Sequence, residues 1–259
     1  MTFGFITDVH YADKATVATR YYRDGLPKLQ DAVSKWNEKS VDFAVMCGDF
    51  TDHGGNNATM ALTDLATMDA AYAVFSGSRY YVFGNHENDQ LTKAQFLANT
   101  AMPAAYYSFD KNGVHFVVLD GNYRSNSDAD PYAPGNYAWN VNYVPPNQRA
   151  WLAADLAGTS LPVVVFCHYR LDTTGDYALA NASAVRTILE ASGKVIAVFT
   201  GHNHINVFSK INDIPYCGMM AATEGVYPKN AYAIVSVYPE CVSIKGYGDQ
   251  QSYAVQRSA

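Results

Sequence analysis

Short apolar runs of this chain end repeatedly in side chains that bind metal ions. Each run is strand-like and is followed at once by a carboxylate, an amide or an imidazole. A buried strand that ends in this way presents its ligands at one edge of the sheet in an α/β fold. The endings are Asp8-Val9-His10, Gly48-Asp49, Gly84-Asn85-His86-Glu87, Cys167-His168 and Gly201-His202-Asn203-His204. A single ending of this kind is common, but the series predicts a preorganised binuclear metal centre.

The order of the predicted elements gives the fold class. Strands over 2–7, 41–47 and 79–83 alternate with amphipathic helices over 22–39 and 57–76. A β-α-β-α-β order predicts a parallel sheet with helices packed against it, because parallel strands need crossover connections. The chain therefore belongs to the α/β class.

The second half continues this pattern and then changes to short strands. We expect a hairpin at Asn112-Gly113, a surface excursion over 121–146, and an antiparallel tail of short strands. The remaining predicted helices and strands cover 147–158, 161–166, 182–192, 195–200, 205–210, 214–217, 231–237 and 241–246. Without a clear linker, residues 1–259 are predicted to form one domain, with the 121–146 excursion near the site.

Composition and net charge limit the kinds of partner that the chain can bind. The chain has 259 residues, a formal net charge of −6 and no cluster of Lys and Arg, so duplex nucleic acid would meet a repulsive field. A small phosphate ester is acceptable because bound cations reverse the local charge. We expect no membrane span, and the strand-like start does not resemble a signal peptide. A cytoplasmic protein and an exported one whose leader is absent from this chain both remain open, as do the oligomeric state and a Cys217–Cys241 disulfide.

Spacing within the motifs assigns chemistry to individual residues. Asp8 and His10 are two residues apart, so in an extended backbone they share a face and can reach one ion. Asp49 follows Gly48, which permits a tight turn, and its carboxylate can bridge two cations. His202 and His204 repeat the two-residue spacing after another glycine.

Neighbouring residues of the Asn85-His86-Glu87 segment are predicted to have different roles. The amide oxygen of Asn85 is a neutral metal ligand, whereas His86 faces the opposite way and is placed to meet the substrate. We expect His86 to protonate the leaving oxygen or to stabilise charge on the phosphoryl group. Glu87 either orients that imidazole or caps a turn. His53 and His115 fit no ligand pattern, although His53 is a candidate for substrate contact.

In their order and spacing, these motifs resemble the calcineurin-like metallophosphoesterase superfamily from residue 8 to residue 204. The resemblance implies a four-layer αββα sandwich with the metals at the carboxyl ends of the central strands. It also implies that one metal takes Asp8, His10 and His204, that the other takes Asn85, His168 and His202, and that Asp49 bridges them. The implied cofactors are two divalent or mixed-valence ions, with Mn, Fe, Zn and Co not distinguished.

The implied reaction is phosphoester hydrolysis by attack of metal-bound hydroxide, with Asp49 and His86 as catalytic residues. Phosphodiesters and phosphomonoesters are the first substrate classes. Nucleoside-diphosphate-linked compounds of the ADP-ribose or CDP-alcohol type are the alternative, and a non-catalytic protein-binding scaffold is a remote one.

Branch assignment rests on fewer residues. Asp52 stands where purple acid phosphatases carry a metal-binding Tyr, so that branch is disfavoured. The segment 8–13 with Tyr21-Tyr22-Arg23 looks like the manganese-dependent ADP-ribose/CDP-alcohol diphosphatase group. That group tends to have Gln in place of His10, and small phosphodiesterases share the other motifs.

Substrate specificity is predicted to come from polar side chains around the metals. Arginines can clamp a second phosphate or a carboxylate. The candidates are Tyr11, Arg20, Arg23, His53, Asn56, Arg124, Tyr169 and Arg170. Tyr169 and Arg170 are favoured because they follow a ligand directly, and the 121–146 excursion is a candidate wall or lid over the site.

Overall fold

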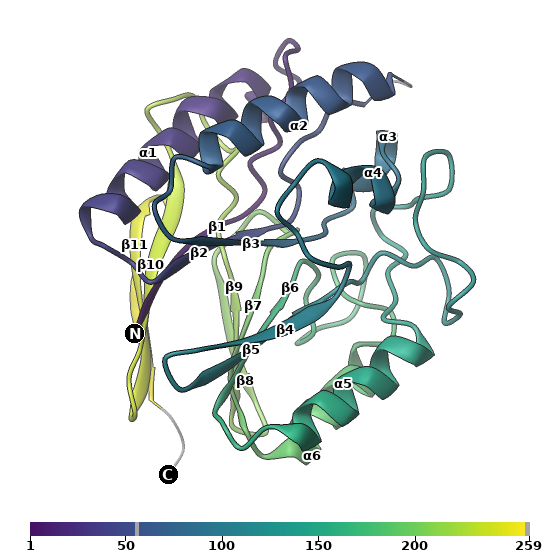
Figure 1. Ribbon diagram of the computed structural model, residues 1–259, viewed down its shortest axis with the longest axis vertical. Helices are drawn as coiled ribbons and strands as arrows, with labels where there is room; N and C mark the ends of the chain where they lie inside the picture. Colours follow the sequence, from purple (N-terminus) through teal and green to yellow (C-terminus); the bar gives the residue numbers. More distant parts are fainter. Residues whose placement is uncertain (55–56, 257–259) are drawn as a thin grey trace.

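The protein is built around two six-stranded mixed sheets that face each other (Figure 1). The structure, a computed structural model, describes residues 1–54 and 57–256. The first sheet has the order β12-β11-β10-β1-β2-β3 and the second β4-β5-β6-β7-β9-β8. Helices α1 (Gly25–Glu38) and α2 (Ala58–Tyr72) cover the outer face of the first sheet, and α5 (Pro146–Gly158) and α6 (Ala182–Ser192) cover the second (Figure 1). The predicted four-layer αββα sandwich is confirmed.

The strand bounds agree closely with the apolar runs of the sequence. In the first sheet they are β1 (Thr2–Ile6), β2 (Phe43–Cys47), β3 (Ser78–Val82), β10 (Ala231–Val237), β11 (Cys241–Gly248) and β12 (Tyr253–Gln256). In the second they are β4 (Tyr107–Lys111), β5 (Val114–Leu119), β6 (Val163–Cys167), β7 (Val195–Thr200), β8 (Val207–Ile211) and β9 (Ile214–Gly218). Three short helices complete the fold: η1 (Tyr22–Asp24), α3 (Glu87–Gln90) and α4 (Lys93–Ala98).

An aromatic interface joins the two sheets. Phe3 of β1 stacks on Phe43 of β2 at 5.1 Å between ring centroids, and its edge contacts Phe116, Phe166 and Phe199 of the second sheet. All five side chains are fully buried. Edge-to-face pairs of this kind add to the free energy of burial, so this interface fixes how the two sheets are placed relative to each other.

The antiparallel tail prediction is wrong in part. The hairpins β8-β9 and β10-β11 are antiparallel as expected. However, β9 pairs with β7 in parallel, and β10 crosses to the first sheet to pair antiparallel with β1. Periodicity in the sequence shows which residues of a strand are buried but not which neighbour the strand pairs with. The short elements α3, α4 and β12 were not predicted either, because they carry too few residues for a periodic signal.

The sheet geometry brings the motif-bearing loops to one edge. Strands β1, β2 and β3 run parallel, as do β6 and β7 in the other sheet. The loops that follow these strands touch across the interface, because His202 N donates to Asp8 Oδ2 at 3.0 Å and His168 Nδ1 lies 2.8 Å from the Cys47 carbonyl. The site is therefore assembled from both sheets.

Three further expectations concern the chain as a whole. No helix among the described residues is long and apolar enough to cross a bilayer. All four cysteines are free thiols, with Cys47 and Cys167 buried, so the Cys217–Cys241 disulfide is not formed. That residues 1–259 form a single domain stays a prediction.

Candidate metal centre

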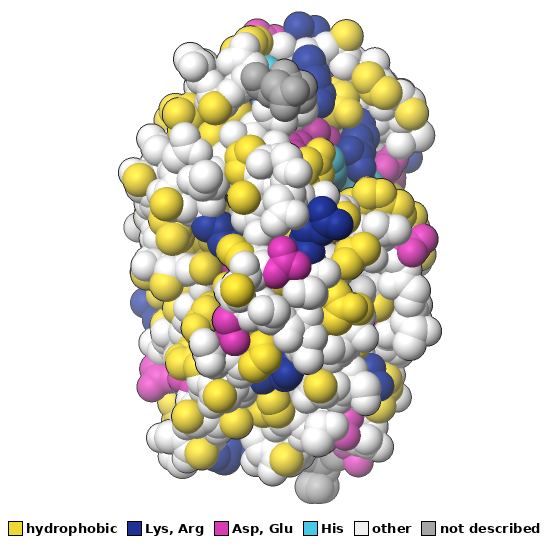
Figure 2. Space-filling model, turned by 90° about the vertical axis from the view of Figure 1, so that its right-hand side faces the viewer, with side chains coloured by type: hydrophobic (Ala, Val, Ile, Leu, Met, Phe, Trp, Pro, Cys, Tyr) yellow, Lys and Arg dark blue, Asp and Glu magenta, His cyan; other side chains and the backbone are white. Residues whose placement is uncertain are grey.

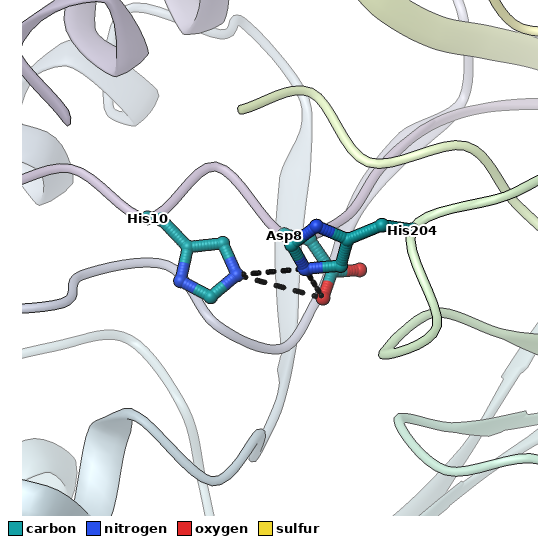
Figure 3. A group of neighbouring side chains, drawn as sticks. All are labelled: Asp8, His10 and His204. Atoms are coloured by element: carbon teal, nitrogen blue, oxygen red, sulfur yellow. Dashed lines mark hydrogen bonds and ion pairs between the residues drawn. The ribbon is translucent and has the colours of Figure 1, made fainter. Parts of the chain in front are cut away.

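One cluster of predicted ligands joins the loops after β1 and β7. The imidazoles of His10 and His204 point toward each other and toward the Asp8 carboxylate (Figure 3). The Nε2 atoms of the two histidines are 3.1 Å apart, and Asp8 Oδ1 lies 3.3 Å from His204 Nε2 and 3.8 Å from His10 Nε2. Asp8 and His10 are fully buried. Three donor atoms converge on one point, which is the arrangement that a divalent cation requires.

A second cluster lies beside the first. Asp49, His168 and His202 each bring one donor atom within 4.8 Å of the others. Three buried atoms in this region make no hydrogen bond: His168 Nε2, His202 Nε2 and Asn85 Oδ1. Buried polar atoms are nearly always paired, and unpaired ones indicate a ligand or ion. The donor set of imidazole, amide and carboxylate fits a second cation.

Asp49 lies between the two clusters. Its Oδ2 atom is 3.2 Å from His168 Nε2 and 3.5 Å from His10 Nε2, so one oxygen faces a histidine of each cluster. Its Oδ1 atom accepts a hydrogen bond from the amide of His86 at 2.9 Å. This is the position that a bridging carboxylate would need.

Five of the residues in the two clusters have a strained backbone. Asp8, His10, Asp49, His202 and His204 all have φ between 50° and 69°, the left-handed region that non-glycine residues seldom adopt. Such conformations cost of order 1–3 kcal/mol each and persist only where the surrounding structure imposes them. The fold therefore holds these side chains in a fixed convergent geometry at some cost in stability.

Two glycines of the motifs are required by close approach. A Cβ atom at Gly84 would collide with the backbone and carboxylate of Asp49, and one at Gly201 would collide with Thr7 and Asp8. The strand ends from different parts of the chain pack within van der Waals distance only because these positions carry no side chain.

Two carboxylates and a backbone carbonyl contact the Nδ1 atoms of three of the histidines, on the side of each ring away from the site. His10 Nδ1 lies 3.1 Å from Asp52 Oδ2, and His204 Nδ1 lies 2.8 Å from Glu224 Oε1. His168 Nδ1 lies 2.8 Å from the Cys47 carbonyl. A proton on each Nδ1 leaves the Nε2 lone pair directed into the site, as in most protein metal centres.

Burial and neighbouring charges shift the pKa values of the residues in the two clusters. Burial raises the pKa of Asp8, but the nearby His168 and the hydrogen bonds from His10 and His204 outweigh it, so the pKa lies well below its usual value. Burial and the neighbouring His168 lower the pKa of His202 to about 3. Burial opposes a charge on His168 too, yet Asp49 and Asp8 raise its pKa to about 9. Cations that replace the proton would satisfy the same carboxylates.

His86 stands at the edge of the centre. Its Nδ1 atom is 3.2 Å from both Asp52 Oδ1 and Asp89 Oδ2, and its Nε2 atom is 3.4 Å from the guanidinium of Arg20. Burial disfavours a charge on this ring, but the carboxylates of Asp49 and Asp52 raise its pKa well above the usual value. An imidazole in this position can donate a proton into the adjoining cavity.

Glu87 has a different role from the first of the two expected. Its carboxylate does not orient His86; it accepts hydrogen bonds from the amides of Gly84, Asp49 and Phe50. These amides belong to the turns after β3 and β2, so the buried Glu87 ties two ligand-bearing loops together. Asp52 and Asp89 hold the imidazole instead. The sequence offered no local signal for Asp89 or Glu224, whose contacts depend on tertiary structure.

The two favoured specificity candidates do not reach the cavity. Tyr169 is completely buried, and its hydroxyl donates to Asn122 Oδ1 while its ring packs against His202 at 4.8 Å. The guanidinium of Arg170 makes a two-fold hydrogen bond to Asp172, at 3.0 and 2.8 Å. The contacts with Asn122 and Asp172 draw these two side chains away from the cavity, so a position soon after a ligand in the sequence does not place either of them there.

Most other candidates for substrate specificity also form contacts away from the cavity. His53 pairs with Asp64 at 2.6 Å, Arg23 with Asp13 at 2.6 Å, and Arg124 with Asn136 at 3.2 Å, and none of these lines the cavity. Tyr11 pairs through its backbone with Thr51 and does not line the cavity either. His115, which fits no ligand pattern, lies between Asp110 and Asp155. Asn56 lies outside the described residues.

A cavity of about 330 Å³ opens above the two clusters. Among the specificity candidates in the described part of the chain, Arg20 alone lines it. Sequence reasoning missed its aromatic members. The lining residues are Arg20, Asp49, Asn85, His86, Tyr137, Trp139, Tyr177, His202 and His204. Figure 2 shows histidine beside basic and acidic side chains in the upper part of this face of the molecule. Tyr137 and Trp139 come from the 121–146 excursion, which therefore forms a wall of the cavity, as predicted.

Comparison with known proteins identifies the family. A model of the family described as calcineurin-like phosphoesterase matches residues 1–206. The chain belongs to this family. The predicted membership is confirmed, and the phosphoesterase is a metal-dependent hydrolase that cleaves phosphoesters with two metal ions.

Related proteins refine the comparison. A protein of Oryza sativa subsp. japonica named manganese-dependent ADP-ribose/CDP-alcohol diphosphatase is 27% identical over 292 aligned residues, which cover 95% of this chain and 90% of the rice protein. A protein of the same name from Arabidopsis thaliana is 32% identical over 131 residues, 46% of this chain and 42% of that protein.

Solved structures confirm the fold. The crystal structure of a dimetal phosphatase from Danio rerio superposes with a TM-score of 0.87 at 22% identity and covers 99% of both chains. A purple acid phosphatase from yellow lupin superposes with a TM-score of 0.64 at 12% identity, covering 99% of this phosphoesterase and 53% of the lupin chain. At these identities the likeness concerns the fold alone.

Proposed function

We propose that this phosphoesterase is a manganese-dependent diphosphatase that acts on nucleoside-diphosphate-linked compounds of the ADP-ribose or CDP-alcohol type. The observation that carries the proposal is the match to the rice protein of that name, which runs through nearly the whole of both chains. The cavity is consistent with such a substrate because it combines a cationic side chain with ligands for two metal ions.

The proposed ligand assignment follows the two clusters. One ion is held by Asp8, His10 and His204 and the other by Asn85, His168 and His202, with Asp49 shared between them. The unpaired Nε2 and Oδ1 atoms and the carboxylates behind the histidines support this assignment. When bound, the two cations lower the pKa of water and neutralise oxygens of the phosphate.

His86 is proposed as the catalytic acid. Asp52 and Asp89 hold its Nδ1 atom and favour the protonated ring, while the ring faces the cavity. A positioned acid can protonate the oxygen of the leaving group as the phosphoester bond breaks.

Arg20 is proposed to bind the second phosphate. Its guanidinium lines the cavity, one-third exposed, and is held at 2.9 Å by Asp52. Burial disfavours its charge, yet Asp52 and Asp49 raise the pKa of Arg20 above its usual value, so it stays charged. A fixed guanidinium beside two cations suits a diphosphate better than a monoester, which offers only one phosphate.

A comparison of substrates tests the proposal. Protein stripped of metal and reloaded with Mn²⁺, Co²⁺, Zn²⁺ or Fe²⁺ would be assayed with ADP-ribose, CDP-glycerol, bis-p-nitrophenyl phosphate and p-nitrophenyl phosphate. We expect kcat/KM for the first two to exceed the others by about tenfold or more, or ~1.4 kcal/mol of transition-state binding. Equal rates, or a preference for either p-nitrophenyl ester, would assign the enzyme to the phosphodiester or phosphomonoester branch instead.

A further inference from the structure

Three half-exposed aromatic side chains stand at the mouth of the cavity. Tyr137, Trp139 and Tyr177 are 39%, 44% and 48% exposed, and all three line the cavity above the metal ligands. We call these three residues the aromatic rim. Two of them belong to the excursion over 121–146, and Tyr177 belongs to the loop between β6 and α6. Large aromatic side chains from separate segments meet here on the surface, beside the candidate metal ligands.

The rim borders the second cluster of ligands directly. The rings of Trp139 and Tyr177 are 5.6 Å apart, and their centroids lie 6.2 and 5.6 Å from the ring of His202. Arg20 and His86 line the same cavity. A bound molecule can therefore contact the aromatic rim, the ligand residues and the guanidinium together.

Buried polar groups fix the backbone that carries the rim. The hydroxyl of Tyr132 lies 2.7 Å from the carbonyl oxygen of Val141 and 2.8 Å from Asn142 Oδ1, within hydrogen-bonding distance of both. The side-chain amide of Asn142 donates to the carbonyl of Trp139 at 3.1 Å. The backbone carbonyl of Asn142 accepts from the backbone amide of Ala180 at 2.8 Å. Tyr132 and Asn142 are buried. Tyr132 holds the excursion together and Asn142 joins it to the β6–α6 loop, so the rim is a preformed surface.

Arg170 supports the other side of the rim. Its backbone amide donates to the carbonyl of Tyr177 at 3.1 Å, while its carbonyl accepts from Leu179 at 3.0 Å. The two-fold contact with Asp172 holds its guanidinium beneath this loop. Preformed aromatic surfaces bind flat ligands at little cost in conformational entropy.

We infer that the aromatic rim is the nucleobase subsite of this enzyme, where the base of a nucleoside-diphosphate-linked substrate stacks. The inference rests on the proposed function, since it names the part of that substrate which the rim receives. A nucleotide joins a flat ring to an anionic diphosphate, and the cavity offers aromatic faces together with Arg20 and the metal ligands. Because every base has a π-face, stacking tolerates different bases, and the enzyme accepts adenine and cytosine alike.

Nucleotide binding measured without turnover is the first test. AMP or ribose 5-phosphate would be added to the Mn²⁺-loaded enzyme, and tryptophan fluorescence would be recorded with correction for adenine absorption. We expect AMP to quench the emission and ribose 5-phosphate to leave it unchanged. Trp139→Phe should abolish the response, whereas the control Trp151→Phe should keep it, because Trp151 lies on α5 outside the cavity.

Kinetics supply a matched second test. ADP-ribose would be compared with diribose diphosphate, in which a hydroxyl replaces adenine. We expect Trp139→Ala and Tyr177→Ala each to raise KM for ADP-ribose about tenfold with kcat nearly unchanged, and to leave diribose diphosphate unaffected. Trp139→Phe and Tyr177→Phe should stay within about threefold of the wild type because they keep an aromatic face.

The outcomes separate this inference from the proposed function. If the wild type hydrolyses both diphosphates equally well and the alanine variants do not discriminate, the base subsite is wrong while the diphosphatase stands. Quenching by choline but not by AMP would also overturn it, in favour of a cage for quaternary ammonium groups. If the enzyme cleaves neither diphosphate, the proposed function fails, and the AMP titration still decides whether the rim binds a base.

Discussion

Asp52 offers the sharpest prediction about how the metal centre is held. One of its oxygens contacts His10 Nδ1 and the Arg20 guanidinium, and the other contacts Lys14 and His86. Asp52→Asn keeps the shape of the side chain but removes the charge and presents an amide donor to atoms that already carry hydrogen. Loss of a partner behind a ligand histidine typically weakens metal binding 10–100-fold, or about 1.4–2.7 kcal/mol.

The effect should fall on one ion and not on both. Asp52 contacts His10 of the first cluster, but it makes no contact with His168 or His202 among the described interactions. Equilibrium dialysis against Mn²⁺ with metal analysis would resolve a weakened and an unchanged site. Asp13→Asn is the matched control, because Asp13 makes an exposed ion pair with Arg23 away from the centre. Unchanged affinity at both sites, or equal weakening at both, would refute the reasoning.

Three other predictions concern catalysis and stability. His86→Ala should lower kcat at least about 100-fold while the Mn²⁺ content stays at the wild-type level, and loss of metal would show instead that His86 is a ligand. Asp155→Asn should destabilise the protein more at pH 6 than at pH 9. Burial lowers the pKa of His115, but the hydrogen bonds that its ring donates to Asp155 and Asp110 outweigh burial and raise the pKa above its unfolded value. The stabilisation from these hydrogen bonds is therefore fully present below about pH 6.5 and is lost as the pH rises through the folded pKa. Urea denaturation at both pH values measures this difference, and a larger effect at pH 9 would contradict it. Lys28→Met should cost about 2–4 kcal/mol of unfolding free energy, because it removes the partner of two carbonyls that Lys28 Nζ now contacts, the buried one of Ala222 at 2.7 Å and the half-buried one of Gly225 at 2.6 Å. A loss below about 0.5 kcal/mol by the same method would contradict it.

The residues that form the two candidate metal clusters could be predicted from the sequence because their signal is local. A strand end followed by Asp-x-His or Gly-His-x-His carries its own spacing, and parallel strands bring such ends to one edge. The carboxylates that contact the Nδ1 atoms of these histidines carry no such local signal. Glu224 lies 20 residues from His204 along the chain, and only the fold brings the two side chains to 2.8 Å.

The side chains that line the cavity could not be predicted from the sequence for a related reason. Sequence adjacency placed Tyr169 beside a ligand, which is correct, but its side chain turns into the core and bonds Asn122. Trp139 and Tyr177 have no motif and become neighbours only through loop contacts such as that between Ala180 and Asn142. Side chains on long loops are placed by tertiary contacts that periodicity does not encode.

The most direct test of the central claim is a crystal structure of the Mn²⁺-loaded enzyme with anomalous diffraction data. The proposed assignment predicts two manganese peaks on either side of Asp49, one bounded by Asp8, His10 and His204 and the other by Asn85, His168 and His202. A single peak in this region, or a peak bounded by Asp52, His86 and Asp89, whose donor atoms also converge, would contradict it.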